Sequence, residues 1–221
     1  MQKKERFRLF LDYFTTHFPE PQTELHFGSP YELLVAVILS AQCTDKRINQ
    51  VTPALFARFP DPASLAAASV EEVFSYIRSV SYPNNKAKHL VGMARILTET
   101  FGGEVPASVE ELQRMPGVGR KTAHVILSIV YNQPTMAVDT HVFRVSHRLG
   151  LAPKTATTPL SVEKALMKYV PIAYVPKAHH WLILHGRYTC LARSPKCDSC
   201  PLTSACLYYA KLNKALPTPT E

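Results

Sequence analysis

Four cysteines are crowded into a short segment near the carboxyl end of this chain. Cys190, Cys197, Cys200 and Cys206 follow the spacing C-x6-C-x2-C-x5-C. In a compartment that keeps thiols reduced, so many cysteines so close together indicate a bound metal. Structural zinc sites are usually built from two C-x2-C pairs, and this segment has one, whereas a [4Fe–4S] cube takes its ligands at four separated corners. The spacing favours a [4Fe–4S] cluster over zinc, and four unrelated buried cysteines are the remaining alternative.

Neither a targeting signal nor a membrane span is visible in the sequence. The first residues, MQKKERFRLF, carry charges and lack the apolar core of a secretory signal. The longest apolar run, residues 33–39, is far shorter than the roughly 20 residues that cross a bilayer. We therefore expect a cytoplasmic monomer, associated with the nucleoid if bacterial, with no membrane partner. The fifth cysteine, Cys43, stands alone and is expected to line the core or a pocket.

The charge balance points to an anionic partner. Lysine and arginine number 25 against 17 acidic residues, in a chain of 221 residues that is long enough for one large domain or two small ones. A basic surplus on a small protein indicates nucleic acid first and an acidic membrane second. On its own this signal is weak, because many basic proteins bind neither.

Helix-start signals recur along the whole chain. An N-cap residue followed by proline, or by glutamate three positions later, occurs at Ser29, Asp61, Ser69, Ser108 and Thr158. Alternating strand-like segments are nearly absent, so the sequence predicts an all-α fold of about ten short helices. The run at 33–39 has no polar face and is expected at a domain centre. Residues 217–221 are predicted to form a frayed tail.

A glycine-containing turn is expected between two helices at residues 112–123. Pro116 stops the first helix, while Gly117 and Gly119 allow positive φ and close approach of the backbone. The next helix then presents amide donors and the positive end of its dipole, with Arg120 beside it. Such a turn can seat a phosphate oxygen without reading bases. A tight helix connection with no ligand is the alternative.

Lys121 and Asp139 are the candidate catalytic pair. The helix end, Arg120 and partial burial are expected to lower the pKa of the Lys121 amine, and a neutral amine can form a Schiff base. Asp139 precedes a helix predicted at 142–149, which it would cap. Its carboxylate is the candidate to accept a proton and to stabilise positive charge near Lys121.

Two cations lie between the first two clustered cysteines. Arg193 and Lys196 are expected either to compensate the charge of an anionic cluster or to contact a phosphate backbone, and the two roles are compatible.

Together and in this order, the motifs resemble the endonuclease III family of helix-hairpin-helix glycosylases. The resemblance covers almost the whole chain and rests on residues 33–45 with S-A-Q-C-T-D, 115–123, 138–141 with V-D-T-H, 180–187 with H-W-L-I-L-H-G-R, and the four cysteines. It implies two α-helical domains with DNA in the cleft between them. One is a six-helix barrel at 22–133 with the helix-hairpin-helix at about 108–127. The other joins 1–21 to 134–221 and holds the cluster in its loop at 190–206.

The resemblance also implies a bifunctional DNA glycosylase and abasic-site lyase of base excision repair. Such enzymes remove oxidised pyrimidines from damaged double-stranded DNA and cut 3′ to the site by β-elimination. The matching residues would be Lys121 as the Schiff-base nucleophile, Asp139 as its assistant, and Gln42 as the side chain that fills the space left by the flipped nucleotide.

One loop departs from the family pattern. Ser81-Tyr82-Pro83-Asn84-Asn85 precedes Lys86-Ala87 here, where the family commonly shows glycine, then leucine or phenylalanine, then tyrosine. Tyr82 is therefore the candidate to stack or wedge at the lesion. Two alternatives stay open: an adenine-type monofunctional glycosylase of the same superfamily, and a non-catalytic iron–sulfur module that binds DNA. Lys121 and Asp139 discriminate, because mere binding requires neither.

Overall fold

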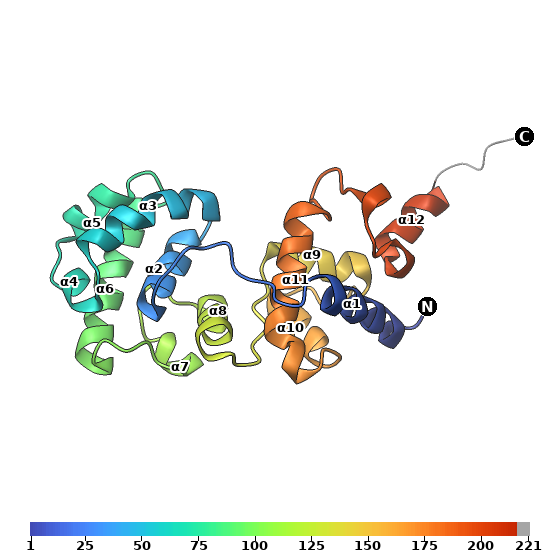
Figure 1. The fold of residues 1–221 in the computed structure, drawn as a ribbon, viewed down its shortest axis with the longest axis horizontal. Coiled ribbons are helices and arrows are strands. Elements are labelled where there is room, and N and C mark those ends of the chain that lie inside the picture. The colour runs from blue at the N-terminus through green and yellow to red at the C-terminus, as the bar shows by residue number, and fades with distance from the viewer. Residues whose placement is uncertain (216–221) are drawn as a thin grey trace, which may run out of the picture. The chain divides into compact units, whose positions relative to one another are not determined.

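The computed structural model describes residues 1–215, so the tail predicted at 217–221 lies outside it. Every regular element in this range is helical, which confirms the predicted all-α fold. No helix in the described range is both long and apolar enough to span a membrane. The α-helices are α1 (Lys3–His17), α2 (Pro30–Ser40), α3 (Asp45–Arg58), α4 (Pro62–Ala66), α5 (Val70–Ile77), α6 (Pro83–Phe101), α7 (Val109–Leu112), α8 (Arg120–Tyr131), α9 (Thr140–Leu149), α10 (Pro159–Met167), α11 (Val175–Tyr188) and α12 (Leu207–Ala215), with short 3-10 segments at Ile172–Tyr174, Cys197–Ser199 and Thr203–Ala205 (Figure 1).

The chain forms two compact units, each with its own buried core. The central unit spans Thr23–Gln133 and contains α2 to α8. The terminal unit joins Met1–Gln22 to the chain from Pro134 onward and contains α1 and α9 to α12. The roles expected for the two parts, a six-helix barrel and a cluster domain, stay predictions.

Helix α2 lies at the centre of the central unit. Its residues 33–39 are each at most 8% exposed, as predicted for a run without a polar face. Helices α3, α6 and α8 pack around it, and α6 in turn packs against α4 and α5. Full burial of each large apolar side chain contributes about 1.5–3 kcal/mol, so α2 anchors the core of this unit.

The predicted helix starts are confirmed by their caps. The observed N-caps that accept a first-turn amide include Ser29, Asp61, Ser69, Ser108 and Thr158. Asp61 and Ser64 form a reciprocal capping box. Glu32, three positions after Ser29, forms no such box, because its carboxylate accepts the amide of Gly28, the residue before the cap, over 2.5 Å. Each such cap stabilises its helix by about 1 kcal/mol, which accounts for the close match in helix starts.

An aromatic cluster joins the two ends of the chain in the terminal unit. Phe10 and Phe14 of α1 pack against Trp181 of α11, with ring centroids 6.1 and 5.7 Å apart. The Trp181 Nε1–H donates to the carbonyl of Phe18 over 2.7 Å. The N-terminal helix is thus held by both packing and a buried polar contact.

A close helix crossing in the terminal unit places the start of α9 against α11. A Cβ at Gly186 of α11 would come within 2.9 Å of the His141 Cβ and 3.1 Å of the Val145 Cγ2. Glycine is therefore required for α11 to approach α9 this closely. The crossing fixes the position of the first turn of α9, where Asp139 lies.

Candidate functional site

A turn between α7 and α8 carries the glycines and the lysine singled out in the sequence. The chain turns at Pro116 and Gly117 before α8 begins at Arg120. Val118 donates its amide to the carbonyl of Met115 over 3.1 Å, and both side chains are buried. The turn is therefore held by its own hydrogen bond and by two apolar anchors.

The two glycines of this turn have different roles. Gly117 has φ +82°, and a Cβ there would lie 3.1 Å from the His89 Cβ and 3.2 Å from the Ile38 Cγ2. Backbone and packing both require glycine at that position. Gly119 has φ −89° and ψ 176°, so of these two residues only Gly117 uses the expected positive φ. A Cβ at Gly119 would meet nothing within 4 Å, which leaves the backbone before α8 open to close approach.

Lys121 lies in the first turn of α8, next to Arg120. The N-cap, Gly119, offers no side-chain acceptor to the amides of this turn, and the positive end of the helix dipole lies here. Both cationic side chains are exposed. The partial burial predicted for Lys121 is wrong, because α8 turns Ala123 and His124 toward the core and leaves residue 121 on the solvent side.

Asp139 is the N-cap of α9, as predicted. Its Oδ1 accepts the amides of His141 and Val142, both over 2.8 Å. Its Oδ2 lies 3.4 Å from the His141 Nδ1, within ion-pair distance but without hydrogen-bond geometry. The aspartate side chain is 13% exposed. One carboxylate oxygen is thus committed to the helix cap, while the other lies beside a histidine.

Gln42 and Tyr82 lie on neighbouring loops of the central unit. Both are exposed, Tyr82 by 63%. The Ser81 hydroxyl donates to the carbonyl of Gln42 over 2.7 Å and so joins the two loops. The structure therefore brings together two residues that the sequence predicted separately as DNA contacts.

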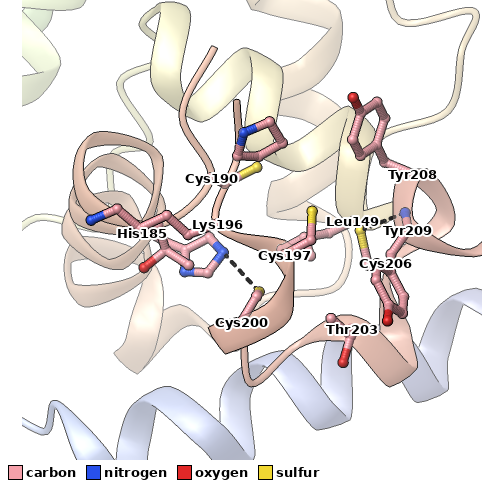
Figure 2. A pocket seen from close by; sticks show the side chains of 12 residues that line it. Leu149, His185, Cys190, Lys196, Cys197, Cys200, Thr203, Cys206, Tyr208 and Tyr209 are labelled. Carbon is pink, nitrogen blue, oxygen red and sulfur yellow. Dashed lines mark hydrogen bonds between the residues drawn. The ribbon is translucent and has the colours of Figure 1, made fainter. Parts of the chain in front are cut away.

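The four clustered cysteines line one pocket of the terminal unit, as Figure 2 shows. Cys190 follows the end of α11, Cys197 begins the 3-10 segment Cys197–Ser199, Cys200 caps its end, and Cys206 directly precedes α12. The donor set is therefore four thiols, brought together as the spacing predicted. Among residues 1–215, no three Cys, His, Asp or Glu side chains form a group that could hold a single metal ion.

Two arginines of α9 hold the loop that begins at Cys190. Arg148 donates to the carbonyls of Leu191, over 2.6 Å, and Ala192, over 3.0 Å, and its Nη1 lies 3.5 Å from the Cys190 Sγ. Arg144 donates to the carbonyl of Cys190 over 3.2 Å. Two parallel contacts from one guanidinium fix the direction of this loop, which a lysine ammonium would not do.

The pocket disfavours bare thiolates. Burial raises the pKa of the Cys200 and Cys206 thiols, and the neighbouring cysteines raise each further. Burial also lowers the pKa of His185 to about 4, so its ring is neutral at pH 7, with Nε2 3.7 Å from the Cys200 Sγ (Figure 2). Four thiolates gathered here need a compensating cation such as a metal centre.

The two cations of the cysteine loop are solvent-exposed, and Lys196 also lines the cysteine pocket. Arg193 and Lys196 are exposed, and the Lys196 amide donates to the carbonyl of Thr189 over 2.9 Å, which closes the loop. Ser194 between them has φ +49°. Both exposed side chains can be reached by an external anion, and the Arg148 Nη1 lies 3.5 Å from the Cys190 Sγ.

Comparison with known proteins gives close relatives over nearly the full length. The family described as HhH-GPD superfamily base excision DNA repair protein matches residues 35–172. Endonuclease III of Escherichia coli K12 is 47% identical over 88% of this chain and 92% of its own length. Endonuclease III of Bacillus subtilis is 45% identical over 92% of this chain and 93% of its own length. The chain belongs to the endonuclease III family.

Solved structures agree with this assignment to the endonuclease III family. One, a trapped endonuclease III–DNA covalent intermediate in an estranged-adenine complex, has a TM-score of 0.90 at 43% identity and covers 96% of this chain and 100% of that one. A thermostable thymine-DNA glycosylase has a TM-score of 0.82 at 21% identity over 95% of this chain and 97% of its own, which supports the shared fold alone.

Four side chains of this endonuclease III family member were not identified from the sequence. Arg148 and Arg144 are four positions apart, a spacing that places both on one face of α9 and could have been noticed. His185 and Lys86 carried no such signal. A lysine is usually solvated, and only the structure shows that Lys86 is 5% exposed.

Proposed function

We propose that this chain is a bifunctional DNA glycosylase and abasic-site lyase that removes oxidised pyrimidines from duplex DNA. One observation carries the proposal. Lys121 stands exposed at the open N-terminal end of α8, in a chain that shares its fold, at 43% identity, with an endonuclease III trapped as a covalent DNA intermediate. An amine is a side chain that can form such a covalent bond with a sugar carbon.

In this reaction the Lys121 nitrogen bonds to C1′ of the flipped nucleotide while the bond from C1′ to the damaged base breaks. The departing nucleobase takes the electron pair of the broken bond, and the Lys121 amine loses a proton to a nearby proton acceptor. Opening of the sugar ring gives the Schiff base. Removal of a C2′ proton then expels the 3′ phosphate and cuts the strand. Because Lys121 is exposed in the protein alone, exclusion of water from its amine has to come from the bound duplex.

Asp139 supplies the carboxylate for this sequence of steps. It belongs to the terminal unit and Lys121 to the central unit, and we propose that both act on the same nucleotide. A carboxylate there accepts the amine proton and stabilises positive charge on the sugar. Its capping bonds to the first turn of α9 hold it in one orientation.

DNA contacts are proposed at three places. The open backbone at Gly119, with Gly117 shaping the turn and Arg120 adjacent, would hold a phosphate. Arg193 and Lys196 would contact the backbone from the cysteine loop. Gln42 and Tyr82 would enter the space left by the flipped nucleotide. The partner is damaged double-stranded DNA, and we place the protein in the cytoplasm as a monomer.

The four cysteines would hold a [4Fe–4S] cluster. The donor set fits such a cluster. Four cysteines line the pocket, cysteine thiolates are the usual ligands of iron–sulfur clusters, and the four lie at separate points of the 190–206 loop. The Tyr209 amide lies 3.4 Å from the Cys206 Sγ and Arg148 lies near Cys190, donors of the kind that stabilise ligand sulfurs. When bound, the cluster cross-links the 190–206 loop and can exchange one electron. The barrel role of the central unit and the cluster role of the terminal unit belong to the same proposal.

A panel of duplexes, each with one defined lesion, tests the activity. We expect incision 3′ to thymine glycol and to a preformed abasic site, and no incision of the undamaged duplex. Denaturing gels resolve the product ends, and borohydride traps the Schiff base as a covalent protein–DNA adduct. Absence of both incision and adduct with every lesion in the panel would contradict the proposed function and favour the non-catalytic alternative.

Substituting Asp139 separates its two roles. Asparagine caps a helix about as well as aspartate, so Asp139→Asn should leave the melting temperature unchanged while base excision slows by about 10²–10⁴-fold. Asp139→Ala loses the cap as well, worth about 1 kcal/mol, which lowers the melting temperature by roughly 2–4 °C. Thermal unfolding and single-turnover excision measure the two effects. Full activity in Asp139→Asn would leave the residue with a structural role only.

A further inference from the structure

Two neighbouring loops of the central unit each hold a non-glycine residue in the left-handed region. Gln42, in the connection from α2 to α3, has φ +55°. Tyr82, the N-cap of α6, has φ +55° and ψ 50°. Side chains other than glycine rarely adopt this conformation, and it persists where the surroundings hold it in place. Both side chains are exposed, so the contacts that hold this conformation have to be made to the backbone of the two loops.

The first of these contacts joins the loops directly. The Ser81 Oγ donates to the carbonyl of Gln42 over 2.7 Å, across 39 positions of sequence. A glycine or alanine at position 81 would supply no hydroxyl for this bond. The link between the two loops therefore depends on the Ser81 side chain.

The second contact comes from a buried lysine beneath the loops. The Lys86 Nζ donates to the carbonyls of Leu39 and Ala41, both over 2.7 Å, and the Lys86 amide donates to the carbonyl of Tyr82 over 3.1 Å. These are carbonyls at the end of α2, where a cation is favourable because of the helix dipole. Burial lowers the pKa of Lys86, and Cys43 partly opposes this effect.

The contacts form a closed ring. Going around it, Tyr82 is bound by the Lys86 amide, the Lys86 ammonium binds the residue before Gln42, and Ser81, the neighbour of Tyr82, binds Gln42 itself. Such a ring fixes the two left-handed residues relative to each other. Neither loop can shift without breaking a hydrogen bond that involves the other.

We propose that Ser81 and Lys86 are positioning residues that hold Gln42 and Tyr82 as one preorganised pair, which enters the duplex where the damaged nucleotide is flipped out. The inference rests on the proposed function. Preorganisation lowers the ordering cost that the two loops would otherwise meet on binding. It acts on recognition of the extruded state, and the chemistry at Lys121 is unaffected once the DNA is saturating.

Ser81→Ala tests the link with little risk to folding, because the serine is only partly buried and the change removes a single hydroxyl. Loss of one hydrogen bond should reduce the preference for a duplex with a stable abasic analogue over undamaged duplex by about threefold to tenfold. Ser81→Thr keeps the hydroxyl and should restore the preference. Ser75→Ala is the matched control: the Ser75 Oγ also donates to a carbonyl over 2.7 Å, but within one helix, α5. Binding constants and the trapping rate at saturating DNA are measured on the holoprotein.

A double-mutant cycle distinguishes positioning from a general effect on stability. In a Gln42→Ala, Tyr82→Ala background, Ser81→Ala should cost nothing further, because no pair remains to be positioned. A 2-aminopurine placed in the duplex next to the abasic analogue becomes more fluorescent when it unstacks. Its fluorescence should rise less on binding of Ser81→Ala than on binding of the wild type. Lys86→Met should act in the same direction, with Lys88→Met, exposed on the same helix, as its control.

The outcomes separate the inference from the proposed function. Unchanged lesion preference in Ser81→Ala, or an equal loss in the Gln42→Ala, Tyr82→Ala background, overturns the positioning role while leaving the lyase intact. A wild type that neither prefers the lesion duplex nor forms a trapped adduct overturns the proposed function itself, and the positioning role with it.

Discussion

Lys121→Ala abolishes the borohydride-trapped DNA adduct and slows strand cleavage at an abasic site by at least about 10³-fold, the expected result of removing a covalent nucleophile. Lys121 is exposed in the first turn of α8, so its loss leaves the packing unchanged and alters stability by no more than about 0.5 kcal/mol. The affinity for duplex DNA should fall only by the contribution that one cation near a phosphate makes to binding. Gel detection of the adduct, thermal unfolding and a binding titration measure the three effects.

The matched control for this nucleophile is Lys88→Ala, an exposed lysine of α6 in the same unit. It should form the adduct at the wild-type rate. An adduct that persists in Lys121→Ala would mean that another amine is the nucleophile. A catalytic role requires that Lys121→Ala form no adduct while its binding to lesion DNA weakens only by the contribution of one cation.

Cys200→Ala removes the proposed cluster and with it the order of residues 190–206. The purified wild type should be yellow-brown, with broad absorbance on the order of 400 nm, and the variant colourless. Binding of a metal centre contributes to the folding free energy of the segment that holds it. We therefore expect the free energy of unfolding of Cys200→Ala to be lower than that of the wild type by several kcal/mol. For a chain of this size that corresponds to a fall in melting temperature of roughly 10 °C. Limited proteolysis should cut within the loop of the variant.

Cys43→Ala is the internal control for this experiment. Cys43 is partly buried against the core of the central unit and does not line the cysteine pocket. Its substitution should keep the colour, the iron content and the protease resistance of the wild type. A colourless wild type with one zinc per chain would replace the cluster with a zinc site, and Cys200→Ala with full iron content would remove this cysteine from the ligand set.

Much of the fold follows from local chemistry that is written in the sequence. A serine, threonine or aspartate accepts a first-turn amide wherever it precedes a helix, so Ser29, Asp61 and Ser108 marked real helix starts. Asp139 was identified as a cap for the same reason. The run at 33–39 was buried as predicted, because a helix with no polar face has no side to present to water.

The two corrections concern properties that neighbours in space decide. Gly119 has an ordinary φ because the turn already reverses at Gly117, where the packing of Ile38 and His89 leaves room for no side chain. Lys121 is exposed because the rotation of α8 is set by the apolar residues that it buries against α2. Neither the backbone angle of one glycine nor the rotation of one helix can be determined from residues adjacent in the chain.

The sequence by itself determined the all-α fold, the helix starts, the four-thiol set and the relationship to endonuclease III, because these depend on residue type and spacing along the chain. Only the tertiary structure decided that Lys86 is buried under the ends of two loops, that Ser81 joins them, and that Arg148 holds the cysteine loop. Each of these contacts joins residues distant in sequence to a backbone carbonyl. Every residue has the same backbone carbonyl, so the sequence does not indicate which residue accepts a hydrogen bond from a given side chain.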